Sequence, residues 1–378
     1  MKKHAFIPLA EPDLTGNEIK YLNQCINSSW ISSKGEFINK FEDSFAAFIG
    51  SKYAISTSNG TTALHLALVS LGIGKGDEVI VPDLTFIATA NSVVYTGARP
   101  VLVDVERETC NIDPNKIVIK ITKNTRAILV VHLYGYPVNM KKILEIGQKY
   151  NLKIIEDAAE AHGARINIEP RTKYQGHWPM VGSIGDVGCF SFYGNKIITT
   201  GEGGMIVTNN KAVADKIRLL RDHGQDKVKR YYHKVIGYNY RMTNMQAAVG
   251  LAQLERINEF IKKKREIAEL YNKLLKGVPG LILPTETKLA KNVYWMYCLI
   301  IDLPYPKTRD QLIKILDKEN IETRPFFYPL HVLPPYRTSG DFNTASYLSK
   351  HGINLPSAVT IKEKDIVKVT NIIRRYAT

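Results

Sequence analysis

The stretch that decides the fold runs from residue 153 to residue 157 and has the sequence Lys153-Ile154-Ile155-Glu156-Asp157. Three earlier runs share its short apolar centre, at residues 78–82, 99–104 and 127–132. Helix-like segments separate these runs, and one of them repeats apolar residues at helical spacing between residues 63 and 71. Short apolar strands that alternate with helices predict an α/β fold with a mostly parallel central sheet, covered on both faces.

Polar residues follow these predicted strands, at the edge of the sheet where ligands bind in parallel α/β folds. We therefore treat the residues at the strand ends as candidates for a binding site: Asp83, Asp104, His132, Glu156 and Asp157.

The pattern changes near residue 245, where a long amphipathic helix is predicted from Met245 to Leu275. A strand at residues 293–301 and a helix at residues 309–318 follow it, and Thr308 is a plausible start for that helix. We therefore expect two domains. Residues 1–245 form an N-terminal segment and a large α/β domain, and residues 246–378 form the connecting helix and a small α+β domain.

Composition limits the possible function classes. The 378 residues carry a formal net charge of +15, but the basic residues are scattered and form no stripe with aromatics, so nucleic-acid binding is disfavoured. A basic surface suits anionic substrates. No apolar stretch approaches the ~20 residues of a membrane span. The four cysteines are far apart and lack metal-ligand spacing, so we expect a cytoplasmic protein with no metal and no membrane partner.

Four segments could carry chemistry, and the second of them lies at the end of a predicted strand. Residues 56–65 form a turn rich in glycine and hydroxyls that opens into a helix, and such a turn presents N–H groups to a phosphate. An ordinary capped helix start is the alternative, and His65 is interpreted as a packed core residue. Asp157 could hold a protonated pyridine nitrogen, or it could cap a helix or pair with an arginine.

The third and fourth segments contain a lysine and an arginine. An apolar strand is predicted to end at Lys196, before a glycine-rich hairpin, so a partly desolvated amine with a lowered pKa could form a Schiff base there. Most lysines are solvated surface groups, which is the alternative. Arg241, in the polar loop before residue 245, could bind a phosphate or form a structural ion pair.

Taken together, the motifs resemble one family. The order of phosphate turn, Asp157 and Lys196 is similar to that of fold-type I pyridoxal-phosphate enzymes. The residues within each motif resemble those of the DegT/DnrJ/EryC1/StrS sugar aminotransferases, and this resemblance extends from Pro8 to about Pro356. The matching stretches are Asn59-Gly60-Thr61-Thr62-Ala63-Leu64, Glu156-Asp157-Ala158-Ala159, Ser191-Phe192, Thr200-Gly201-Glu202-Gly203-Gly204 and Gly237-Tyr238-Asn239-Tyr240-Arg241.

This resemblance implies pyridoxal 5'-phosphate as the cofactor and a homodimer with shared sites. Lys196 would attach the cofactor and move protons, and Asp157 would pair with the ring nitrogen. The resemblance also implies that Asn239 reaches the phosphate of the neighbouring subunit. The remaining cofactor contacts that it implies are Gly60, Thr61 and Ser191 at the phosphate, Phe86 stacked on the ring, and Glu160 near the ring hydroxyl, where many members have Gln.

For the substrate, the resemblance implies contacts from Trp30, Ser32, Lys34, Arg241 and His331. Residues 192–200 and 324–331 most resemble the branch that moves the amino group of L-glutamate to C4 of a GDP-linked 4-keto-6-deoxy sugar. A UDP- or dTDP-linked 4-keto-6-deoxyglucose is the near alternative.

Two other function classes are alternatives to this one. The family's sugar 3-dehydratases typically have His where Lys196 stands, and a non-catalytic regulator would not need Asp157, Ser191 and Lys196 together. Residues 166–180 form a longer segment than the family pattern suggests. That segment is interpreted as a surface hairpin, with a role at the pocket edge as the alternative.

Overall fold

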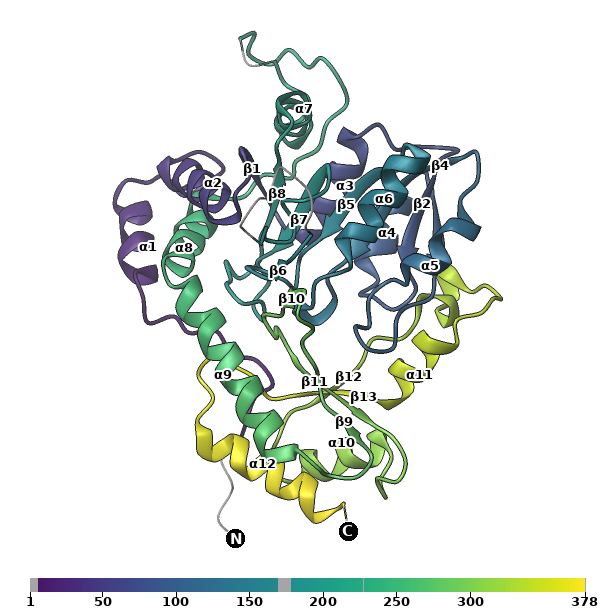
Figure 1. Cartoon of the computed structure of the whole chain (residues 1–378). Coiled ribbons are helices and arrows are strands. Elements are labelled where there is room, and N and C mark those ends of the chain that lie inside the picture. The colour runs from purple at the N-terminus through teal and green to yellow at the C-terminus, as the bar shows by residue number, and fades with distance from the viewer. Residues whose placement is uncertain (1–5, 169–177, 227, 378) are drawn as a thin grey trace.

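A seven-stranded sheet forms the centre of the molecule (Figure 1). The computed structural model describes residues 6–168, 178–226 and 228–377. The sheet has the order β1-β8-β7-β5-β4-β2-β3. Its strands are β1 (Tyr53–Thr57), β2 (Glu78–Pro82), β3 (Arg99–Val103), β4 (Thr125–Val131), β5 (Lys153–Asp157), β7 (Val187–Ser191) and β8 (Gly204–Thr208).

Five of these strands, from β3 through β2, β4 and β5 to β7, run parallel to one another. Strand β8 runs antiparallel to both β7 and β1. Every residue of β2, β7 and β8 is buried, as expected for a sheet covered on both faces. The predicted α/β class with a mostly parallel sheet is confirmed.

Helices flank this sheet and connect its strands (Figure 1). They are α1 (Glu18–Asn27), α2 (Glu36–Ile49), α3 (Gly60–Ser70), α4 (Ala88–Tyr95), α5 (Pro114–Ile117), α6 (Met140–Tyr150) and α7 (Lys211–Arg221). Short 3-10 turns at residues 118–120, 133–135, 330–332 and 334–336 complete the connections.

The helix predicted from Met245 to Leu275 is wrong in one respect, because it is two helices. Helix α8 spans Asn244–Glu255 and α9 spans Ile257–Leu275. Arg256 between them leaves the helical conformation, with φ −108° and ψ 4°. Its guanidinium donates hydrogen bonds to Asp13 at 3.0 Å and to Glu259 at 2.8 Å, which ties the break to the N-terminal segment.

A smaller antiparallel sheet with the order β12-β13-β11-β9 lies after α9. Its strands are β9 (Leu281–Ile282), β11 (Tyr297–Ile301), β12 (Arg324–Pro325) and β13 (Gly352–Leu355). Helices α10 (Arg309–Lys318), α11 (Asn343–His351) and α12 (Glu363–Arg375) accompany it. Helix α10 has the predicted bounds, and the Thr308 side chain caps it.

A second hydrophobic core belongs to this smaller sheet and includes side chains from α9, α10 and α12. Ile7 from the N-terminal segment joins that core and pairs with Ile321 in a parallel bridge. The division of the chain at residues 245 and 246 stays a prediction.

The strand predicted at residues 293–301 begins late, because β11 starts only at Tyr297. Tyr294 adopts a left-handed conformation with φ 49°, which interrupts an extended run there. Trp295 and Met296 consequently lie in a cavity wall instead of a strand.

The longer segment at residues 166–180 lies partly outside the described residues, so its interpretation stays a prediction. At the N-terminal start of this segment, β6 (Arg165–Ile166) pairs with β10 (Ala290–Lys291). Cys25, Cys110, Cys189 and Cys298 are free thiols. Within the described ranges, no helix is long and apolar enough to cross a membrane.

Candidate active site

A cavity of about 510 Å³ opens where the strands of the main sheet end and the small domain approaches. Seven of the eight residues predicted to contact the cofactor line it. They are Gly60, Thr61, Phe86, Asp157, Glu160, Ser191 and Lys196. The structure therefore brings together residues that lie up to 136 positions apart in the sequence, from Gly60 to Lys196.

Lys196 lies in the turn after β7, five positions beyond the strand's last residue Ser191, and not at the strand end as predicted. Its Nζ donates a hydrogen bond to Glu160 Oε1 at 3.5 Å. Only 11% of the lysine side chain is exposed. Burial lowers the pKa of Lys196, while the carboxylates of Glu160 and Asp157 oppose that change. A lysine with a lowered pKa is the kind that attacks an aldehyde.

Glu160 is held in place by the backbone of Tyr134, whose N–H donates to Glu160 Oε2 at 2.8 Å. Tyr134 has a φ of 55°, which is uncommon for a residue with a side chain. Burial raises the pKa of Glu160, and the nearby Lys196 ammonium opposes that rise. The pair thus forms a fixed acid and amine at the cavity wall.

Asp157 ends β5 and directs its carboxylate to the same cavity. Thr89 Oγ1 donates to Asp157 Oδ2 at 2.9 Å, and the Ala159 N–H donates to Oδ1 at 3.2 Å. Burial raises the pKa of this carboxyl, because a desolvated anion is unfavourable. A cationic ring nitrogen placed beside it would restore the charged form.

The N-terminus of α3 forms another part of the cavity wall. The Asn59 side chain accepts a hydrogen bond from the Thr62 N–H at 2.9 Å, so the predicted cap is present. Gly60 and Thr61 precede the first intrahelical bond, so their N–H groups are available to an anion. A Cβ on Gly60 would lie 2.8 Å from Ser191 Cβ, and only glycine permits this close approach.

Other strand-end candidates have structural partners outside the cavity. Glu156 Oε2 pairs with His132 Nε2 at 3.1 Å and accepts the N–H of Gly182 at 2.8 Å. Asp83 accepts the N–H of His331 at 2.8 Å and pairs with its ring at 2.6 Å. His331 is therefore held by Asp83 and does not line this cavity in the described part of the chain.

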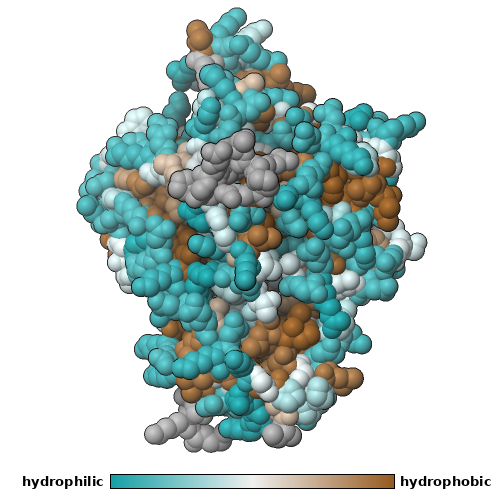
Figure 2. All heavy atoms as spheres, in the orientation of Figure 1, coloured by the Kyte–Doolittle hydropathy of each residue, from teal (hydrophilic) through white to brown (hydrophobic). Residues whose placement is uncertain are grey.

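Asn239 and Arg241 also lie outside this chain's own cavity. Arg241 forms an ion pair with Asp222, which is the structural alternative considered above, and Asn239 is exposed. Both lie at the base of the segment after α7, where Asp222 and Asn239 form an antiparallel bridge and the Tyr240 carbonyl accepts the Ser58 N–H at 2.9 Å. Figure 1 shows the outer part of this segment reaching away from the sheet at the top of the molecule. Figure 2 shows hydrophobic residues near its tip, where Val228 and Ile236 are 95% and 92% exposed.

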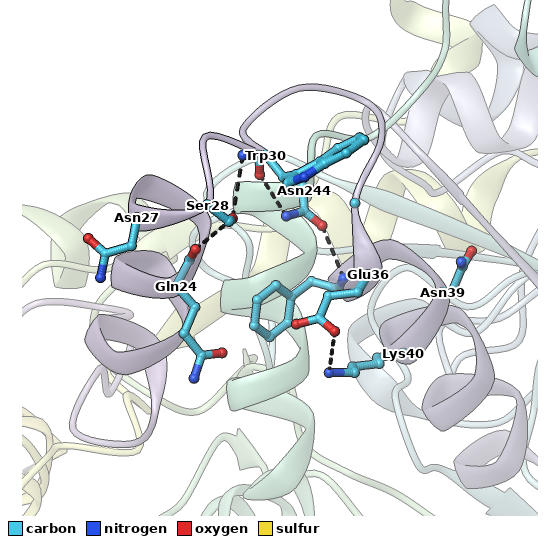
Figure 3. Close-up of a pocket in the computed structure, with 10 residues that line it drawn as sticks. Gln24, Asn27, Ser28, Trp30, Glu36, Asn39, Lys40 and Asn244 are labelled. Carbon is cyan, nitrogen blue, oxygen red and sulfur yellow. Dashed lines mark hydrogen bonds and ion pairs between the residues drawn. The ribbon is translucent and has the colours of Figure 1, made fainter.

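Trp30 lies at a second, more open cavity of about 1020 Å³. Figure 3 shows its carbonyl held by the Asn244 side chain, which donates to it at 2.7 Å. Ser32 and Lys34 are exposed in the same loop, and the Ser32 carbonyl accepts the Asn244 N–H at 2.6 Å. The structure thus keeps these three predicted substrate residues together, but apart from the Lys196 cavity.

An aromatic wall made by Tyr134, Trp295 and Phe327 lines the same cavity and was not predicted from the sequence. Tyr134 and Phe327 are stacked with ring centroids 5.5 Å apart, and Phe327 packs at 5.7 Å against Phe86. Tyr134 comes shortly after the predicted strand at residues 127–132, so its place after a strand end could have identified it as a site residue. Trp295 lies within the strand predicted at residues 293–301, and its place in that strand gave no sign of a role in the site.

The residues present fit pyridoxal phosphate. Helix N–H groups and Ser191 suit its phosphate, Asp157 suits its ring nitrogen, Lys196 suits its aldehyde, and Phe86 offers an aromatic face.

Comparisons with known proteins agree with this fit. Residues 12–374 match the model of the DegT/DnrJ/EryC1/StrS aminotransferase family. The chain is 48% identical to GDP-perosamine synthase of Caulobacter vibrioides, over 96% of both chains. It is 45% identical to GDP-perosamine synthase of Escherichia coli O157:H7, over 98% of both. The solved structure of DesV from S. venezuelae is similar with a TM-score of 0.89 and 31% identity, over 98% of both chains.

The fold, the lysine cavity and these relatives define the class, which is that of pyridoxal-phosphate-dependent sugar aminotransferases. More particularly, the chain belongs to the DegT/DnrJ/EryC1/StrS aminotransferase family.

Proposed function

We propose that this enzyme transfers the amino group of L-glutamate to C4 of GDP-4-keto-6-deoxymannose and so makes GDP-perosamine. The observation that carries the proposal is the name shared by the relatives at 43–48% identity, which match nearly the whole chain. The cavity supports it, because a buried amine stands between Glu160 and the end of β5.

In this proposal each side chain has a defined task. Pyridoxal phosphate, when bound, supplies the electron sink that makes the substrate's C–H bond acidic. Lys196 would hold the cofactor, and its Nζ would accept and return the substrate's proton. Asp157 would pair with the ring nitrogen, and Gly60, Thr61 and Ser191 would hold the phosphate. Phe86 would contact the ring, and Glu160, beside the Lys196 amine, would contact the ring hydroxyl.

We further propose a cytoplasmic homodimer with shared active sites. Asn239 and Arg241 lie at the base of the segment after α7, and the exposed Val228 and Ile236 of that segment leave apolar surface for a second copy. Asn239 would reach the partner's phosphate and Arg241 the partner's nucleotide diphosphate. Trp30, Ser32, Lys34 and His331 would meet the nucleotide sugar in the assembled site.

A panel of GDP-, UDP- and dTDP-linked 4-keto-6-deoxy sugars tests the specificity. Each is incubated with L-glutamate and the cofactor-loaded enzyme, and the product is identified by NMR. We expect the GDP sugar to be aminated at C4 with the highest kcat/KM. A higher kcat/KM for the UDP or dTDP sugar would support the alternative substrate instead, and a dehydrated product would support the 3-dehydratase class.

A further inference from the structure

Trp295 packs directly against the reactive amine. Lys196 Nζ lies 3.7 Å from the centroid of the Trp295 ring, on the face of the indole. An ammonium over an aromatic face is attracted by the negative charge of that face, most strongly for tryptophan and away from water. Trp295 is only 4% exposed, so this contact is largely shielded from solvent.

The same indole also holds the backbone that carries the lysine. Its Nε1–H donates a hydrogen bond to the Asn195 carbonyl at 2.7 Å, and Asn195 immediately precedes Lys196. The tryptophan thus contacts both ends of the lysine, the main chain at its base and the amine at its tip. With Glu160 Oε1 at 3.5 Å, the amine is held between a carboxylate and an aromatic ring.

Trp295 is itself fixed from two sides. Its ring stacks on Tyr134, with centroids 6.2 Å apart and planes inclined by 15°. Its carbonyl accepts a hydrogen bond from Lys264 Nζ at 2.8 Å, and the same Nζ donates to the Ser357 carbonyl at 2.6 Å. Lys264 lies on α9 and is 4% exposed, so it fastens the segment before β11 and the segment after β13 to that helix.

We propose that Trp295 is a positioning residue that holds the Lys196 amine for its reaction with the cofactor, and that Lys264 acts through Trp295. The lysine side chain has a flexible four-carbon stem, so its amine must return to one place each time the cofactor is released. The indole face and Glu160 define that place. This inference rests on the proposed role of Lys196, but not on which nucleotide sugar is the substrate.

Among the described residues, the titratable groups near the Lys196 amine are Glu160, Asp157 and His162. Glu160 and Asp157 favour its charged form. His162 is also close, but burial lowers its pKa to about 3, so it is neutral near pH 7. Trp295 carries no charge and acts on the amine through its ring alone.

The test measures the titration of Lys196 in the full-length chain freed of cofactor. Competitive labelling with acetic anhydride across pH, followed by peptide mass spectrometry, gives the apparent pKa of this single amine. Trp295→Leu removes the ring and should lower that pKa, whereas Trp295→Phe keeps an aromatic face and should lower it less. Lys264→Met should shift it in the same direction as Trp295→Leu.

Two matched variants control for general effects. Lys263→Met alters the neighbouring lysine of α9, which is 46% exposed, and Trp178→Leu removes a tryptophan that packs on Lys291. Neither should change the titration. In the cofactor-loaded enzyme we expect Trp295→Leu to lower kcat about tenfold to a hundredfold with KM changed less than about threefold, the pattern of a misplaced reacting group.

The proposal is overturned if Lys196 titrates in folded Trp295→Leu as it does in the parent, with folding checked by circular dichroism. It is equally overturned if Lys263→Met shifts the titration as far as Lys264→Met does. Failure of the proposed sugar specificity would leave the labelling result unchanged, so the two failures are distinguishable.

Discussion

Opposing electrostatic effects set the pKa of Lys196. Burial disfavours its charged form, whereas the Glu160 carboxylate at 3.5 Å and the nearby Asp157 favour it. In its proposed role, the Lys196 amine would attack an aldehyde only when unprotonated and would also carry a proton during the reaction. A pKa lowered by burial but restrained by Glu160 suits both tasks.

Replacing Lys196 by alanine should remove covalent attachment of the cofactor and lower kcat by about a thousandfold or more. Attachment is measured by borohydride reduction followed by mass spectrometry of the intact chain. Lys262→Ala, at a lysine that is 80% exposed, serves as the control and should retain attachment. Attached cofactor or parental turnover in Lys196→Ala would show that another residue performs the chemistry.

Glu160→Gln should lower the pKa of Lys196. The carboxylate raises that pKa in the parent, so its removal leaves burial less opposed. The pH profile for the rate of cofactor attachment to the cofactor-free chain should then move to lower pH. Glu36→Gln, at a carboxylate that is 63% exposed, is the control. An unshifted profile in Glu160→Gln would mean that the pair does not tune the amine.

At the scale of elements, the sequence predicted best where local pattern and packing agree. Strands β2 and β5 and helix α10 have their predicted bounds, because each joins an apolar pattern to clear end signals. The break at Arg256 could not be predicted, since arginine favours helices and the partner Asp13 lies 243 positions away.

The site residues, like the elements, could be predicted from the sequence only in part. Both Glu156 and Asp157 end one strand, but successive side chains of a strand point to opposite faces, so only one can face the cavity. Pattern alone does not say which, and the structure assigns Glu156 to the loop at residues 182–185. The resemblance selected Asp157. Trp295 was missed because Tyr294, with its left-handed φ, turns the chain out of the expected strand.

Lys264, on helix α9, should make the stability of the folded chain depend on pH. Burial lowers the pKa of Lys264 from the usual 10.5 of a lysine to about 7, so between these values the unfolded chain binds more protons than the folded one. Stability therefore rises with pH in that window, by up to about 1.4 kcal/mol per pH unit, and this contribution is flat below pH 7.

We expect the denaturant midpoint of the parent to rise from pH 7 to pH 9 more than that of Lys264→Met, measured by circular dichroism in urea. The absolute midpoint of the variant is not the readout, since it also loses two hydrogen bonds. Lys263→Met should follow the parent. Parallel curves for the parent and Lys264→Met would contradict the lowered pKa.

At the scale of the whole molecule, the predicted site residues fall into two groups. Seven of the residues predicted to contact the cofactor line the Lys196 cavity, while Asn239, Arg241 and the Trp30 loop lie elsewhere on the same chain. The proposed two-fold dimer would resolve this division, because each subunit would present its outlying groups to the cavity of the other. The exposed apolar residues of the segment after α7 favour such contact.

Mixing two defective variants tests this arrangement. In a shared-site dimer, Lys196→Ala still contributes an intact Asn239, and Asn239→Ala still contributes an intact Lys196. An equal mixture that exchanges freely holds half its chains as mixed dimers, each with one intact site. Activity should therefore recover to about a quarter of the parent at a cofactor concentration that leaves Asn239→Ala largely empty. Exchange is verified by mass spectrometry of differently tagged subunits. If exchange is complete and the mixture is no more active than the mean of its two parts, Asn239 serves its own chain or none, because a site built within one subunit cannot be repaired by its neighbour.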